Sequence, residues 1–136
     1  MECGTAESQT QKPILRLTWG MKKYQTIDAH ELHQRMASHD RPVLVNALAR
    51  EAFERERIPG SISIPVGDAM RLAGAVLAKD QPVVVYCSSR SCTASPTLAQ
   101  KLVDVGFTEV LDFEGGVAEW ESAGYPMQRA RELATA

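Results

Sequence analysis

One cysteine, Cys87, stands where the sequence changes from an apolar run to a polar turn. Residues 83–86 read Val-Val-Val-Tyr, residues 88–93 are polar or small, and apolar residues recur at helical spacing over residues 94–102. A thiol between the end of a strand and the start of a helix is surrounded by backbone N–H groups, and the positive end of the helix favours a thiolate. Such a setting can lower the pKa of a cysteine from its ordinary value of about 8.5. The sequence therefore predicts a sulfur nucleophile at Cys87.

The residues after Cys87 suit an anion-binding loop. Successive loop amides can point into one small bowl, which would hold the outer sulfur of a persulfide. Small residues let the backbone curl closely, and serine and threonine hydroxyls add hydrogen bonds. Arg90 could steer an anionic sulfur donor, because a guanidinium pairs with sulfonate or phosphate oxygens; the alternative is a solvated arginine at the loop tip. The candidate substrate-binding residues are Ser88, Ser89, Arg90, Ser91, Cys92 and Thr93.

Cys92 lies across the same loop and has three interpretations. It could be a resolving thiol that attacks a Cys87 persulfide, releases sulfide and leaves a disulfide. It could also be a small residue that faces the helix, or a redox switch. We expect no metal, because neither a histidine nor a third cysteine stands at ligand spacing, and no cofactor. Arg50 and Arg57 are candidates for the rim of the pocket, although each is more often a surface residue.

The composition limits the class of protein. With 136 residues and 44% hydrophobic residues, the chain fits one domain with a real core. The formal net charge is −2 and no long basic block occurs, so we expect no nucleic-acid partner. No apolar stretch approaches the ~18–20 residues that span a bilayer, so we expect no membrane partner. An odd number of cysteines and no apolar signal core near the start indicate a reducing, cytoplasmic setting.

Three segments divide the chain. Residues 1–20 are polar and mixed, and we interpret them as a loose N-terminal extension. Residues 21–128 form the single predicted domain, and residues 129–136 form a C-terminal tail. Met1 and Met21 are both candidate starts of translation.

Short apolar runs alternate with helical patterns along the predicted domain. Residues 43–46 and 83–86 lack alternation and suit strands covered on both faces, as in a parallel sheet. Residues 61–64, 108–112 and 24–27 are further strand candidates. Helices are predicted from a start at residues 27–32, capped by Asp28, to about residue 38, and over residues 51–57, 66–78, 94–105 and 116–123. Met70, Ala73 and Leu77 form the expected inner side of the helix over residues 66–78.

This alternation predicts an α/β fold with helices on both faces of a parallel sheet. Ligands of such sheets gather at the carboxyl ends of the strands, where Cys87 stands.

Three motifs in order resemble the rhodanese family of sulfurtransferases over roughly residues 24–127. The first runs from residues 43–46 through Ala52-Phe53 to residues 57–61, Arg-Ile-Pro-Gly-Ser; the second is the strand over residues 83–86 with Cys87 and Thr93. The third comprises residues 106–110, Gly-Phe-Thr-Glu-Val, residues 114–117, Glu-Gly-Gly-Val, and Trp120.

The resemblance implies a five-stranded parallel sheet flanked by helices. It also implies that Cys87 takes a sulfane sulfur from a donor such as thiosulfate, a persulfide or a polysulfide, and passes it to a thiol, cyanide or a protein acceptor.

The chain departs from the family pattern beside this loop. Asn46-Ala47-Leu48 replaces the usual Asp-Val-Arg, Arg57 replaces a common histidine, and Cys92 takes a place often held by arginine. Arg50 lies two residues beyond the missing arginine and could substitute for it. These changes put the preference for thiosulfate in doubt.

Three other functions compete with sulfur transfer. A non-catalytic or redox-sensing rhodanese-like module is the main rival, since the family aspartate and arginine are missing. A cysteine phosphatase would need arginine after five intervening residues, where this chain has Thr93. A thiol–disulfide reductase usually has a shorter spacing between its cysteines than Cys87 and Cys92 have.

Overall fold

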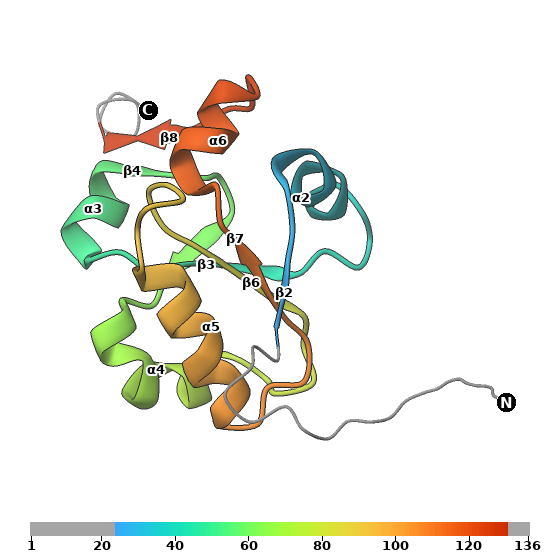
Figure 1. Cartoon of the computed structure of the whole chain (residues 1–136), viewed down its shortest axis with the longest axis vertical. Helices are drawn as coiled ribbons and strands as arrows, with labels where there is room; N and C mark the ends of the chain where they lie inside the picture. Colours follow the sequence, from blue (N-terminus) through green and yellow to red (C-terminus); the bar gives the residue numbers. More distant parts are fainter. Residues whose placement is uncertain (1–23, 131–136) are drawn as a thin grey trace, which may run out of the picture.

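A five-stranded parallel sheet organises the part of the chain that the computed structural model describes, residues 24–130. The predicted N-terminal extension, both candidate start methionines and Cys3 lie outside this range. The strands follow the order β2-β7-β6-β3-β5 across the sheet (Figure 1). Their bounds are β2 Gln25–Thr26, β3 Val43–Asn46, β5 Ser61–Ser63, β6 Val83–Tyr86 and β7 Val110–Phe113. The predicted fold class is confirmed.

Helices cover both faces of the sheet, because the central strands are apolar on both sides. Val83 and Val85 of β6 face one core, which includes side chains of α4 (Ala69–Val76) and α5 (Ala94–Asp104). Val84 and Tyr86 face the other core, which includes side chains of α2 (Ala29–Met36) and α6 (Gly116–Ser122). The unbroken apolar run that predicted a strand buried on both faces is thus explained.

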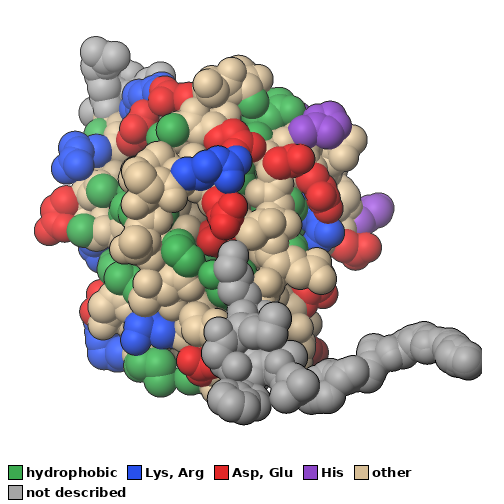
Figure 2. Space-filling model, viewed as in Figure 1, with side chains coloured by type: hydrophobic (Ala, Val, Ile, Leu, Met, Phe, Trp, Pro, Cys, Tyr) green, Lys and Arg blue, Asp and Glu red, His purple; other side chains and the backbone are tan. Residues whose placement is uncertain are grey.

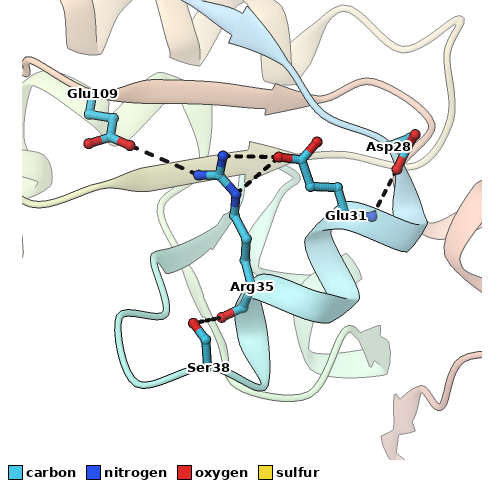
Figure 3. A network of polar contacts seen from close by, with 5 residues as sticks. All are labelled: Asp28, Glu31, Arg35, Ser38 and Glu109. Carbon is cyan, nitrogen blue, oxygen red and sulfur yellow. Dashed lines mark hydrogen bonds and ion pairs between the residues drawn. The ribbon is translucent and has the colours of Figure 1, made fainter.

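The predicted capping of the first helix is confirmed. Asp28 is the N-cap of α2, and its carboxylate accepts a hydrogen bond of 2.9 Å from the backbone N–H of Glu31. Arg35 then pairs with Glu31 at 3.0 Å and reaches Glu109, just before β7, at 3.9 Å (Figure 3). The Arg35–Glu109 pair links α2 to the residue before β7, and each of these exposed pairs contributes little stability by itself.

The helix predicted over residues 66–78 differs in its register. Val66–Asp68 form a 3₁₀ turn, η1, and α4 begins only at Ala69. Ala69, Ala73 and Leu77 are buried, whereas Met70 is 67% exposed. The prediction of Met70 on the inner side was wrong, because the buried face follows the i, i+4 row of Ala69, Ala73 and Leu77 and leaves Met70 beside it.

A short antiparallel ladder lies outside the main sheet and was not predicted. The helix expected over residues 51–57 is α3 (Arg50–Arg55), and β4 (Glu56–Arg57) follows it directly. β4 pairs with β8 (Gln128–Arg129). The sequence analysis assigned Arg129 to the C-terminal tail. Arg129 instead lies in a strand, opposite Glu56 of β4.

The surface of the described residues is mixed in charge. Figure 2 shows acidic and basic side chains interspersed over the visible face. No helix among residues 24–130 has the length and apolar character needed to cross a membrane.

Candidate active site

Cys87 stands directly beyond the carboxyl end of β6, as the sequence predicts. Its loop turns back through a backbone hydrogen bond of 3.0 Å from Cys92 N–H to Ser89 C=O, and α5 begins at Ala94. This turn brings Cys92 over Cys87, whose Sγ lies 3.7 Å from the carbonyl oxygen of Cys92. The loop therefore closes around the Cys87 sulfur.

The surroundings of Cys87 raise the pKa of its thiol, whereas the sequence predicts a lowered pKa. Cys87 is fully buried, and its Sγ lies 3.4 Å from Oγ of the buried Ser95 in α5. Burial raises the pKa of Cys87, and the hydrogen bond to Cys92 raises it further, while the hydroxyl and N–H of Ser95 pull it down. The expectation of a lowered pKa at Cys87 is contradicted, because loss of hydration outweighs the few donors that reach this sulfur.

The loop donors converge instead on Cys92, which is half-buried. Burial alone would raise the pKa of Cys92, but hydrogen bonds from the Cys87 thiol, from the N–H groups of Ala94 and Ser88, and from the Ser88 hydroxyl outweigh it. The net effect lowers the pKa of Cys92. The nearby donors therefore favour the thiolate form of Cys92 more than that of Cys87.

The start of α6 holds the same loop from the other side. Val117 N–H donates to Cys87 C=O at 3.0 Å, and Ala118 N–H donates to Ser88 C=O at 2.9 Å. Gly116 has φ +58°, and a Cβ there would lie 2.2 Å from the carbonyl oxygen of Cys87. The Gly-Gly motif before α6 is thus explained by close approach of two backbones.

Arg90 points toward carboxylates at the loop tip. Its guanidinium pairs with Glu114 at 3.2 Å and with Glu119 at 3.1 Å, and its side chain is 68% exposed. Glu119 also accepts a hydrogen bond of 2.8 Å from Ala29 N–H at the start of α2. The sequence analysis proposes that Arg90 steers an anionic donor. In the structure, Glu114 and Glu119 offset the positive charge of Arg90.

The remaining loop residues divide between two sides. Ser88 lines a cavity of about 390 Å³. Ser89 and Arg90 line a second hollow with Glu119. Ser91 and Thr93 are exposed, and the Ser91 and Ser89 hydroxyls lie 3.1 Å apart.

The cavity beside Ser88 has apolar walls and a charged rim. Its lining residues are Leu48, Ala52, Arg55, Glu56, Ser88, Val117 and Arg129. Arg129 pairs with Glu56 at 2.8 Å and also contacts Glu121. Leu48, at the position of the family arginine, gives the cavity an aliphatic wall.

Arg50 and Arg57 do not line this cavity. Arg50 is exposed at the start of α3. The Arg57 guanidinium stacks on the ring of Phe53 at 4.6 Å, donates to the Phe53 carbonyl and donates to Gln128. The sequence analysis missed Arg55 and Arg129. Arg55 stands three residues after Ala52 in α3, and this helical spacing was the only sequence signal that could have placed it at the cavity.

Asn46 supports the site from beneath. Its Oδ1 accepts from Leu48 N–H at 2.8 Å, and its Nδ2 donates to the Tyr86 hydroxyl at 3.1 Å. Tyr86 also accepts from Ile58 N–H at 3.0 Å and lies 2.9 Å from the Ser61 hydroxyl. Because Ser61 donates to Ile58 C=O at 2.7 Å, the Tyr86 hydroxyl donates to Ser61. An amide at position 46 therefore orients the Leu48 backbone without a charge.

Comparisons with known proteins agree with this geometry. A sulfurtransferase of Allochromatium vinosum is 29% identical over 101 residues, covering 74% of this chain and 92% of that protein. The HTH-type transcriptional regulator Rv0324 of Mycobacterium tuberculosis is 35% identical over 85 residues, covering 62% of this chain. The adenylyltransferase and sulfurtransferase UBA4 of Meyerozyma guilliermondii is 30% identical over 106 residues, covering 72% of this chain. The matched part spans only 36% of that regulator and 24% of that UBA4 protein.

Solved structures show the same fold. The rhodanese-like domain of an Anabaena protein superposes with a TM-score of 0.72 at 24% identity, covering 79% of this chain and 80% of that domain. A Bacillus halodurans protein gives a TM-score of 0.73 at 22% identity, covering 78% of this chain and 77% of that one. The profile of the family described as Rhodanese-like domain matches residues 28–123. With its sheet order, its cysteine loop and this match in agreement, the chain belongs to the rhodanese-like domain family.

Proposed function

We propose that this protein is a sulfurtransferase that carries a sulfane sulfur on Cys87. The observation that carries the proposal is a fully buried thiol at the carboxyl end of the central strand β6, enclosed by a loop whose Ser88 lines a cavity of about 390 Å³. A persulfide needs such enclosure, since its outer sulfur reacts readily with thiols and oxidants.

The chemistry begins at the Cys87 sulfur. Cys87 loses its proton to solvent as its sulfur attacks the sulfane sulfur of the donor. The bond to the outer sulfur forms, and the rest of the donor leaves as sulfite or as a thiolate. Cyanide, a thiol or a protein thiol then attacks the outer sulfur and restores Cys87.

The cavity favours a donor or acceptor with an organic body. Leu48, Ala52 and Val117 offer apolar contact, and Arg55 stands at the rim with the Arg129–Glu56 pair. Small organic ligands bind in clefts with mostly apolar walls and a few polar groups. We therefore propose an organic persulfide ahead of thiosulfate as the donor, in a cytoplasmic setting and with neither nucleic acid nor a membrane as partner.

Formation of thiocyanate tests the proposal. The full chain is supplied with cyanide and with thiosulfate or an organic persulfide, and thiocyanate is measured over time. We expect catalytic formation that Cys87→Ser abolishes and that Cys3→Ser leaves unchanged. Equal rates for Cys87→Ser and the unmodified chain would refute the role of Cys87.

A redox-sensing or binding module is the second candidate function. The burial of Cys87 and its raised pKa favour it, because both slow attack on a sulfur donor. It predicts no thiocyanate from either donor with every variant, while the Cys87 thiol remains reduced and can be alkylated after unfolding.

A further inference from the structure

Cys87 and Cys92 form a thiol pair in which the two sulfurs have different surroundings. Cys87 is fully buried, whereas Cys92 is half-buried. Sγ of Cys87 lies 3.7 Å from the carbonyl oxygen of Cys92, and the turn from Ser89 to Cys92 brings the two residues together. Cys92 is therefore neither a surface thiol nor a residue that simply fills space against α5.

We propose that Cys92 is a second catalytic thiol, which attacks the Cys87 persulfide and releases its outer sulfur as sulfide. The proposal rests on the sulfur transfer to Cys87 proposed above. It gives the protein a further activity, reduction of a sulfane sulfur to hydrogen sulfide, in addition to transfer to an external acceptor.

The arrangement of donors supports this role. Backbone N–H groups of Ala94 and Ser88 and the Ser88 hydroxyl converge on the Cys92 sulfur. A nucleophilic thiolate needs such donors, and it also needs its electrophile within reach. The electrophile would be the Cys87 sulfur, which already lies 3.7 Å from the carbonyl oxygen of Cys92.

The step balances in atoms, charge and protons. Cys87 loses its proton to solvent when it takes the sulfane sulfur, which leaves a Cys87 persulfide anion beside the Cys92 thiol. Sγ of Cys92 then bonds to Sγ of Cys87 while the bond from Cys87 to the outer sulfur breaks. The outer sulfur leaves as hydrosulfide with the proton from Cys92. The outer sulfur gains two electrons, and each cysteine sulfur loses one.

The resulting disulfide stops the protein until a reductant opens it. Two equivalents of a low-molecular-weight thiol restore both cysteines and become one disulfide of that thiol. The half-buried position of Cys92 makes its sulfur the one that such a thiol reaches first. Turnover to sulfide therefore requires a thiol reductant, whereas transfer to cyanide does not.

Intact mass and released sulfide test the proposal. All chains carry Cys3→Ser, so that only Cys87 and Cys92 remain. Each reduced chain is freed of reductant, mixed with an organic persulfide or thiosulfate, quenched in acid and weighed, and sulfide above that of the donor alone is measured. With both cysteines present, we expect loss of two hydrogen masses and one sulfide per chain, with a Cys87–Cys92 disulfide in the peptide map.

The variants separate this proposal from the sulfurtransferase function. Cys92→Ser and Cys92→Ala should gain the mass of one sulfur, keep it until cyanide is added, and release no sulfide. A stable sulfur gain in the chain with both cysteines, equal to that of Cys92→Ser, would overturn the role of Cys92 and leave the sulfurtransferase function standing. Sulfur bound to Cys92 in Cys87→Ser would also overturn it, since Cys92 would then be a carrier. No gain in Cys92→Ser and no thiocyanate formation would instead refute the sulfurtransferase function.

Discussion

The reactivity of Cys87 depends on the few atoms that touch it. Burial and the hydrogen bond with Cys92 raise its pKa, and Ser95 offsets only part of that rise. The loop amides that a sequence would assign to Cys87 reach Cys92 instead. The lowered pKa and the access to solvent therefore belong to Cys92, while Cys87 is the enclosed thiol.

Alkylation at increasing pH tests this division. The pKa of Cys92 is lowered from 9.0 and that of Cys87 is raised from 9.0. Labelling of Cys92 by iodoacetamide should have its midpoint below pH 9.0, and labelling of Cys87 should have its midpoint above it. At neutral pH, Cys87 should react at least about tenfold more slowly, because the reagent reaches it only when the loop opens. Peptide mass spectrometry separates the two cysteines and Cys3; faster labelling of Cys87 would contradict the assignment.

The cysteine loop is held between the end of β6, the start of α5 and the start of α6. β6 ends at Tyr86, directly before Cys87, and α5 begins at Ala94. The first turn of α6 donates two backbone hydrogen bonds to the loop carbonyls. The close approach of α6 requires Gly116, whose positive φ and lack of a Cβ leave room for the Cys87 carbonyl. The position of the cysteine loop is therefore set by a helix that lies far from it in the sequence.

Gly116→Ala should disturb this junction. The left-handed backbone and the new Cβ contact should together lower the free energy of unfolding by roughly 3 kcal/mol and reduce thiocyanate formation. Gly74→Ala is the matched control, because a Cβ at Gly74 meets no atom within 4 Å and alanine favours the helix α4. Urea denaturation of both variants measures the difference. Equal stability of the two variants would show that α6 does not need this close approach.

At the scale of the molecule, the sheet separates two apolar cores. Ile64 belongs to the core shared with α4 and α5, and Ile58 belongs to the core shared with α2 and α6. Both side chains are fully buried. The functional loop lies at the edge where the two layers of helices meet the carboxyl ends of the strands, so the stability of both layers supports it (Figure 1).

Paired substitutions test whether the two cores are independent. Ile58→Val and Ile64→Val should each lower the free energy of unfolding by about 1 kcal/mol through lost burial and a small cavity. Their effects should add within about 0.5 kcal/mol, because the two side chains lie in different cores. Urea denaturation of both single variants and the double variant checks this. A larger coupling would mean that the strands transmit packing changes from one face to the other.

Local sequence determined much of the fold. The strands over residues 43–46 and 83–86 match their prediction, because valine-rich apolar runs favour a buried strand. Asp28 caps the start of α2 with its carboxylate. Gly106 stands directly after Val105, the C-cap of α5. The motif around Cys87 identified the loop and its place at the end of β6.

Tertiary structure alone decided how the surroundings of the Cys87 and Cys92 sulfurs differ. Burial and the direction of each amide depend on how β6, α5 and α6 meet, so the pKa directions of Cys87 and Cys92 could not be predicted from spacing. The β4–β8 ladder joins residues far apart in the chain, and it brings Arg129 and Glu56 to the cavity. Short-range patterns report the strands and helices, whereas long-range contacts set the chemistry between them.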